Sequence, residues 1–260
     1  MIKSIKINDS EMEYISFWTW KKVFVIIPWL SIKSVLTNEN AIISSFSKFS
    51  NEFTIYLFDR LKDIPDNYNI KEMAEDTYAV MQSIWIKSCN IFWASQWWMI
   101  AQCIAINHPN FVEKMILWST TYKIDTNSHN ILSHRIELAK EYNISELINN
   151  FIDTIYCKET INQYWKEILQ SYSEISNSEI QKFIKLTAPT LNFNVEKDLW
   201  RIKCETLIVA SKNDKIFWRE CAKTLSDKIQ SQLYLYEEYG HAVYDEAPDF
   251  RDKMLHFLLN

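Results

Sequence analysis

The sequence predicts an α/β fold, in which a mainly parallel sheet is covered by helices on both faces. Apolar segments of strand length alternate along the chain with segments of helical periodicity, which is the pattern of such a sheet. Several strand segments, such as residues 23–27, are continuous apolar runs, as is typical of strands buried on both faces. The chain has 260 residues and is 48% hydrophobic, so it can form one large core.

The strand and helix segments follow from the spacing of apolar residues. The first two strand segments alternate apolar and polar residues, which indicates a hairpin or two edge strands. The segments with strand character are 2–7, 12–17, 23–27, 53–58, 90–92, 114–117, 206–210 and 232–236. Helical periodicity occurs at 40–49, 70–84, 99–107, 220–229 and 248–259, the last with Pro248 expected in its first turn.

The pattern changes between the sixth and seventh strand segments, where only helical stretches occur. These stretches are 131–142, 145–156, 161–172 and 178–186. We therefore expect a doubly wound, eight-stranded, mainly parallel sheet with a helical lid inserted after the sixth strand. The boundaries would place residues 1–119 and 191–260 in the core and 120–190 in the lid.

Composition excludes several classes of function. A net charge of −5 makes nucleic acid or an anionic membrane surface an unexpected partner. The start of the chain lacks a signal-peptide core, and the longest apolar run is too short to span a bilayer. Five cysteines show no zinc spacing, which favours free thiols in the cytoplasm. With no metal cluster and no phosphate loop, we expect no cofactor, a small-molecule substrate, and a monomer or homodimer.

The stretch from Cys89 to His108 has the layout of a catalytic turn. A short apolar strand leads into Ser95, and a helical pattern follows directly. Strand, sharp turn with a central serine, and helix form the nucleophile elbow, normally written G-x-S-x-G. In this chain the two glycine places hold Trp93 and Trp97.

A serine becomes a nucleophile when a histidine takes its proton and an acid orients that histidine. Ser95, Asp214 and His241 each follow a strand segment, in the chain order serine, acid, histidine. On its own, Ser95 would be interpreted as a helix N-cap. The rival acids and histidines lack this placement: Asp125, Asp153, Asp198 and Asp227, and His108, His129, His134 and His256.

These motifs resemble the lid-bearing α/β-hydrolase superfamily, in the branch with esterases, lactonases and pimeloyl-ester-type carboxylesterases. The resemblance covers the elbow, Pro28-Trp29-Leu30, residues 108–114 and the Gly240-His241 pair, although the family usually has histidine at Pro28. It implies hydrolysis of a small ester, thioester, lactone or amide through an acyl-enzyme. It also implies an oxyanion hole formed by the backbone N–H groups of Leu30 and Gln96. Aspartate-nucleophile relatives are disfavoured because the nucleophile place holds serine.

Glycine is nearly absent from the sequence, whereas tryptophan is abundant. The chain has 11 Trp and 1 Gly, where average usage gives about 7% glycine, or roughly 18 residues. The tryptophans fall at breaks between elements, where glycine supplies positive φ. We interpret most of them as glycines encoded by UGA, which some bacterial lineages read as glycine; Trp165, in a helical pattern, fits least. The positions are Trp18, Trp20, Trp29, Trp85, Trp93, Trp97, Trp98, Trp118, Trp165, Trp200 and Trp218.

If the tryptophans are genuine, the alternative is a non-catalytic protein of the same fold that binds a ligand or a partner.

Two further interpretations concern residues outside the triad. Asp59 and Arg60 are expected to form a turn and a surface ion pair. The lid tyrosines are expected to pack rather than to contact substrate: Tyr122, Tyr142, Tyr156, Tyr164 and Tyr172.

Overall fold

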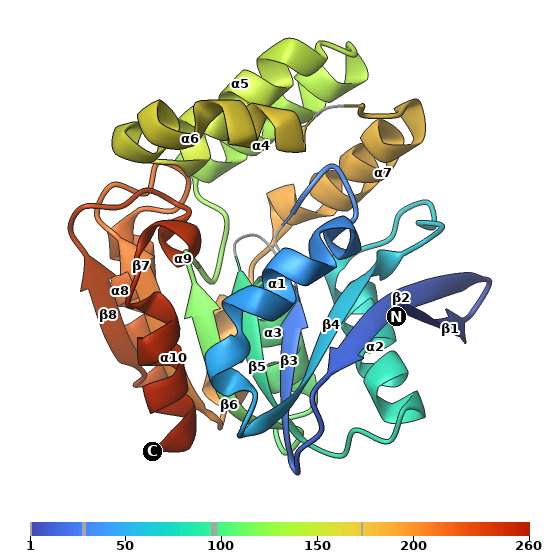
Figure 1. Ribbon diagram of the computed structural model, residues 1–260, viewed down its shortest axis with the longest axis vertical. Coiled ribbons are helices and arrows are strands. Elements are labelled where there is room, and N and C mark those ends of the chain that lie inside the picture. The colour runs from blue at the N-terminus through green and yellow to red at the C-terminus, as the bar shows by residue number, and fades with distance from the viewer. Residues whose placement is uncertain (1, 28–29, 95–97, 173) are drawn as a thin grey trace.

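A computed structural model describes residues 2–27, 30–94, 98–172 and 174–260, and it shows an eight-stranded sheet between two layers of helices (Figure 1). The strands are β1 Lys3–Ile7, β2 Ser10–Phe17, β3 Lys22–Ile27, β4 Phe53–Leu61, β5 Cys89–Ala94, β6 Val112–Trp118, β7 Glu205–Ser211 and β8 Gln232–Tyr236. The predicted α/β class and the eight strands are confirmed.

The strand order is β1-β2-β4-β3-β5-β6-β7-β8. β2 pairs antiparallel with β1 and with β4, which confirms the predicted edge hairpin. Every pair from β4–β3 to β7–β8 is parallel. The carboxyl ends of β3, β5, β6, β7 and β8 therefore lie along one edge of the sheet, where binding sites of open α/β sheets form.

Alternation along the strands gives the sheet two apolar faces. In β5, Ile91 packs with one core cluster and the next residue, Phe92, packs with the other. The first cluster joins the sheet to α2 Ile70–Ser83, α3 Trp98–Asn107 and α8 Arg219–Ile229. The second joins it to α1 Glu39–Ser45 and α10 Phe250–Leu259. Fully burying a side chain such as Phe92 contributes roughly 2–3 kcal/mol.

Two local expectations are wrong. Asp59 and Arg60 lie within β4 and are buried, because the strand continues three residues beyond the predicted end at Phe58. The last helix begins at Phe250 after Asp249, so Pro248 precedes the helix instead of occupying its first turn.

Helices α4 Thr126–Lys140, α5 Ile144–Ile155, α6 Lys158–Ser171 and α7 Asn177–Thr187 lie between β6 and β7 and form the helical lid above the carboxyl edge of the sheet (Figure 1). Side-chain caps at Asp125, Asn143 and Ser176 start α4, α5 and α7. The insertion of a lid after the sixth strand is confirmed. Across the described parts of the chain, no helix combines the length and the apolarity that a bilayer crossing requires.

Candidate active site

The structure brings two of the predicted catalytic residues together. Asp214 follows β7 and His241 follows β8, so neighbouring parallel strands deliver both to the carboxyl edge. Nδ1 of His241 lies 3.0 Å from Oδ1 and 2.9 Å from Oδ2 of Asp214. Their side chains are 2% and 0% exposed. This is the contact by which an acid orients a catalytic imidazole.

Backbone donors fix the orientation of the Asp214 carboxylate. Oδ1 accepts the N–H groups of Ile216 at 2.8 Å and Phe217 at 3.0 Å. The ring of Phe217 lies 5.7 Å from the imidazole of His241. A carboxylate beside Nδ1 favours the tautomer that carries its proton there, which leaves Nε2 as the basic nitrogen.

The loop that carries His241 is bonded to the core and to the lid. The Ser119 hydroxyl, just beyond β6, donates to the carbonyl of His241 at 2.9 Å. Ser119 has a φ of 47°, in the left-handed region that residues other than glycine seldom adopt. The N–H of Ala242 donates to the carbonyl of Ile155 at the end of α5.

Glu246 and Gly240 complete this junction. The Glu246 carboxylate accepts the N–H groups of Gly240 and Cys157, both at 2.7 Å. A Cβ at Gly240 would lie 2.9 Å from the carbonyl oxygen of Ile155 and 3.0 Å from the nitrogen of Cys157. The close backbone approach of lid and histidine loop therefore requires glycine here.

The predicted nucleophile and one oxyanion donor, Ser95 and Gln96, lie outside the described residues, as do Pro28, Trp29 and Trp97. The flanking elements are described. β5 ends at Ala94 between β3 and β6, and α3 begins at Trp98, which confirms the predicted connection from strand to helix.

A small cavity of about 40 Å³, here called the inner cavity, lies beside His241. Leu30, the other predicted oxyanion donor, lines this cavity together with the histidine. Its lining is Leu30, Trp118, Arg135, Phe151, Ile155, Tyr156, Tyr172, Ile216, His241, Ala242 and Asp245. Core and lid thus both contribute to the space next to the imidazole.

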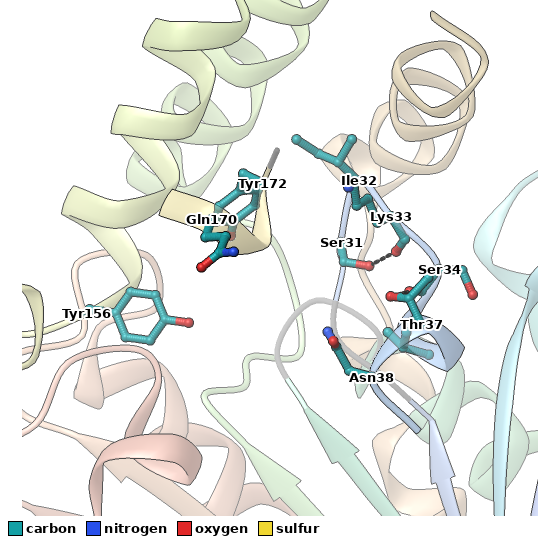
Figure 2. Close-up of a pocket in the computed structure, with 10 residues that line it drawn as sticks. Ser31, Ile32, Lys33, Ser34, Thr37, Asn38, Tyr156, Gln170 and Tyr172 are labelled. Atoms are coloured by element: carbon teal, nitrogen blue, oxygen red, sulfur yellow. Dashed lines mark hydrogen bonds between the residues drawn. The ribbon is translucent and has the colours of Figure 1, made fainter. Parts of the chain in front are cut away.

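A second cavity of about 420 Å³, here called the polar cavity, lies between the segment after Leu30 and the lid. Figure 2 shows the Tyr156 hydroxyl and the Gln170 amide directed into it from the lid side, facing Ser31 and Asn38. The lining is Ser31, Ile32, Lys33, Ser34, Val35, Thr37, Asn38, Tyr156, Gln170 and Tyr172. Tyr156 and Tyr172 line both cavities, and each also packs against a core cluster, as expected from the sequence.

Several ionisable groups of the inner cavity have shifted pKa values, among them Arg135 and Asp245. Burial lowers the pKa of Arg135 to about 10, so the guanidinium remains charged at neutral pH. Asp245 is an exposed residue that lines the inner cavity and a neighbouring one, and many protein atoms surround its carboxyl. The exclusion of water by these atoms raises the pKa of the carboxyl to about 6, with the charge of Arg251 acting in the opposite direction.

Sequence reasoning missed Ser119, Arg135, Asp245 and the bridging role of Glu246. Arg135 had a signal, because it shares an otherwise apolar face of α4 with Leu132, Ile136 and Ala139. The others had none, since their roles depend on contacts between distant segments. Among the described residues, no group of three or more His, Cys, Asp or Glu side chains is placed to hold a metal ion.

Solved structures with the same architecture cover nearly the whole chain. MGS-M2, an alpha/beta hydrolase enzyme from a Medee basin deep-sea metagenome library, is 22% identical and superposes with a TM-score of 0.89 over 99% of this chain and 98% of its own. The chain has the α/β-hydrolase fold. The enol-lactonase from Burkholderia xenovorans LB400 is 12% identical, with a TM-score of 0.86 over 99% of this chain and 100% of its own.

Curated proteins resemble the chain over about three quarters of its length. The protein named "Putative carbamate hydrolase RutD" from Agrobacterium fabrum is 21% identical over 205 residues, which are 76% of this chain and 77% of that protein. A protein of the same name from Pseudomonas savastanoi pv. phaseolicola is 22% identical over 209 residues, covering 75% and 77% of the two chains. No family model matches the chain.

Proposed function

We propose that this protein is a serine hydrolase that cleaves a small ester, thioester, lactone or amide through an acyl-enzyme. The observation that supports this most is the buried Asp214–His241 pair at the carboxyl edge of the sheet. The strand-to-helix connection that contains Ser95 follows β5 at the same edge. The names of the relatives and structural neighbours support hydrolysis and add carbamates, which are amide-like acyl compounds, to the substrate classes.

In this mechanism the Ser95 hydroxyl attacks the carbonyl carbon while Nε2 of His241 takes its proton. Asp214 stays ionised and stabilises the imidazolium that forms. The N–H groups of Leu30 and Gln96 would bind the developing oxyanion; losing one such donor costs roughly 3–4 kcal/mol in other enzymes. His241 then protonates the leaving group, and water releases the acyl group by the same steps.

We assign chemistry to the core, residues 1–119 and 191–260, and substrate selection to the lid, residues 120–190. The substrate would be a small molecule, and the protein a monomer or homodimer. All five cysteines are free thiols, which supports a cytoplasmic location. Burial raises the pKa of Cys103 to about 12 and that of Cys204 to about 11, so both stay protonated at neutral pH, when a thiol is a weak nucleophile.

We further propose that most tryptophans of the written sequence are glycines in the native protein. Trp85 supports this directly, because it follows α2 with a φ of 66°. Its N–H bonds the carbonyl of Gln82, and the N–H of Ile86 bonds that of Met81. These two bonds form a Schellman motif, whose left-handed residue is usually glycine. Trp18, after β2, has a φ of 59°.

Several other tryptophans fit poorly for different reasons. The indole nitrogens of Trp98 and Trp118 are buried without a hydrogen-bond partner among the described residues, although buried indoles usually have one. Others are strongly exposed, at 86% for Trp85 and 70% for Trp200. Trp20 and Trp218 are also about half exposed, at 52% and 53%. These placements are unusual for the largest apolar side chain.

The test compares three full-length proteins: the chain as written, the chain with glycine at every tryptophan except Trp165, and that glycine form with Ser95→Ala. A panel of short acyl esters, thioesters, lactones and carbamates is assayed with each. We expect turnover by the glycine form, none by its Ser95→Ala variant, and little by the chain as written. Turnover that survives Ser95→Ala would contradict the mechanism. UGG codons at the tryptophan positions of the coding DNA would contradict the proposal that these residues are glycines.

A further inference from the structure

Arg135 is held rigidly inside the lid. It comes from α4 and is 3% exposed. Its Nε donates to the Asn150 side-chain oxygen at 2.9 Å, and its Nη2 donates to the Thr154 hydroxyl at 2.5 Å. The guanidinium carbon lies 4.1 Å from the centre of the Phe151 ring. Three residues of α5 therefore fix the plane and the direction of the Arg135 guanidinium group.

The remaining nitrogen, Nη1, has no hydrogen-bond partner among the described residues. Neither partner of Arg135 on α5 is an acid, and burial lowers the pKa only to about 10, so a full positive charge stays enclosed at neutral pH. A buried charge without a counterion is costly and is rarely retained for stability alone. An arginine that binds an anionic ligand does so with a nitrogen that has no partner in the protein and lies at the wall of a cavity.

The inner cavity places this guanidinium in the same space as the catalytic imidazole. Arg135 and His241 both line it, and Tyr172 stands close to the guanidinium. Burial raises the pKa of Tyr172 to about 12 while the charge of Arg135 opposes the rise, so the phenol stays protonated as a second donor. The other ionisable groups of the lining are Tyr156 and the carboxyl of Asp245.

We propose that Arg135 binds a carboxylate of the substrate, so that this site acts on acyl compounds that carry a carboxylate near the scissile carbonyl. This inference rests on the proposed hydrolase function. The planar guanidinium of an arginine matches the geometry of a carboxylate, which it binds better than it binds a neutral polar group.

The experiment uses the full-length glycine form and two esters of similar size, p-nitrophenyl hemisuccinate and p-nitrophenyl butyrate. The variants are Arg135→Met, which removes the charge, and Arg135→Lys, which keeps it without the fork. Arg201→Met is the control, because Arg201 is a partly buried arginine at the end of the short helical segment Glu196–Arg201 and does not line the inner cavity. Thermal midpoints identify variants that fail to fold.

We expect kcat/KM of Arg135→Met for the hemisuccinate to fall about 10- to 100-fold, the effect of one charged hydrogen-bonding group. The butyrate value should change less than about 3-fold, Arg135→Lys should be intermediate, and Arg201→Met should affect both esters equally. An equal loss for both esters in Arg135→Met would contradict the proposal and leave Arg135 as a link between α4 and α5.

A binding measurement separates this inference from the proposed function. Succinate, which needs no turnover, is titrated calorimetrically into the glycine form and into its Arg135→Met variant. Binding lost in the variant supports the inference even if no ester is cleaved, in which case only the hydrolase proposal fails. Turnover of the butyrate without any preference for the hemisuccinate, and no succinate binding, would overturn the inference and leave the hydrolase proposal standing.

Discussion

The carboxyl edge of the sheet and the lid above it present their charges in opposite ways. At the edge, the Asp214 carboxylate is bonded to His241 and to two backbone N–H groups, so its charge is balanced within the protein. In the lid, Arg135 keeps one nitrogen without a partner among the described residues at a shared cavity. The difference indicates that the carboxyl edge holds the catalytic groups in one geometry for proton transfer. The lid, in contrast, offers a charged group that can bind the substrate.

The largest expected effect is at the edge. Asp214→Asn removes the charge that orients His241 and should lower kcat about 10⁴-fold while leaving the fold intact. The matched control is Asp227→Asn, an exposed acid on α8. Steady-state kinetics of the two variants measures the effect. Comparable kcat values for the two variants would show that Asp214 takes no part in catalysis.

The junction between the two regions should be the next most sensitive point. In Gly240→Ala, the added methyl group meets backbone atoms of Ile155 and Cys157 at 2.9–3.0 Å. Backbone cannot move aside cheaply, so we expect a loss of about 1–3 kcal/mol in the free energy of unfolding. Displacement of His241 should also reduce kcat. Urea unfolding and kinetics test this, and a variant with wild-type values in both would contradict the close approach.

A smaller effect of the opposite sign is expected at Trp85. Trp85→Gly removes the cost of a left-handed backbone at a non-glycine residue, so stability should rise by about 1–2 kcal/mol. Trp165→Gly is the control, because Trp165 lies within α6, where glycine costs up to about 1 kcal/mol. Thermal unfolding of the written chain compares the two. A loss of stability in both variants would argue that Trp85 is a native tryptophan.

The smallest effect concerns Asp245. Its folded pKa of about 6 lies above the ordinary value of 3.8, so the unfolded chain ionises first as pH rises. The stability that this carboxyl contributes is complete below about pH 4 and is lost as pH rises through about 6. Asp245→Asn should therefore gain stability relative to the wild type at pH 8 and little at pH 4. Urea unfolding across this range would show a constant difference if the carboxyl titrates normally.

The sequence was sufficient for the parts of the molecule that follow from local pattern. The strand segments predict the sheet, and the residues directly after two of them, Asp214 and His241, prove to be in contact. Ser95 and Gln96 remain predictions, since they lie outside the described residues.

What the sequence could not supply depends on distant contacts. The bond from the Cys157 N–H to the Glu246 carboxylate joins residues 89 positions apart, and no periodicity encodes such a pairing. The end of β4 was missed because Asp59 and Arg60 are charged residues inside a strand, where polarity is usually taken as a turn. Arg135 could have been singled out as a charge on an apolar helix face, but only the folded lid shows which cavity it lines.

The most direct test of the account is covalent labelling of the nucleophile. The full-length glycine form is treated with a fluorophosphonate, and the modified peptide is identified by mass spectrometry. The account predicts one adduct, on Ser95, formed rapidly by this protein and lost when His241 is replaced by alanine. An unmodified Ser95 in a folded protein that still hydrolyses esters would contradict it.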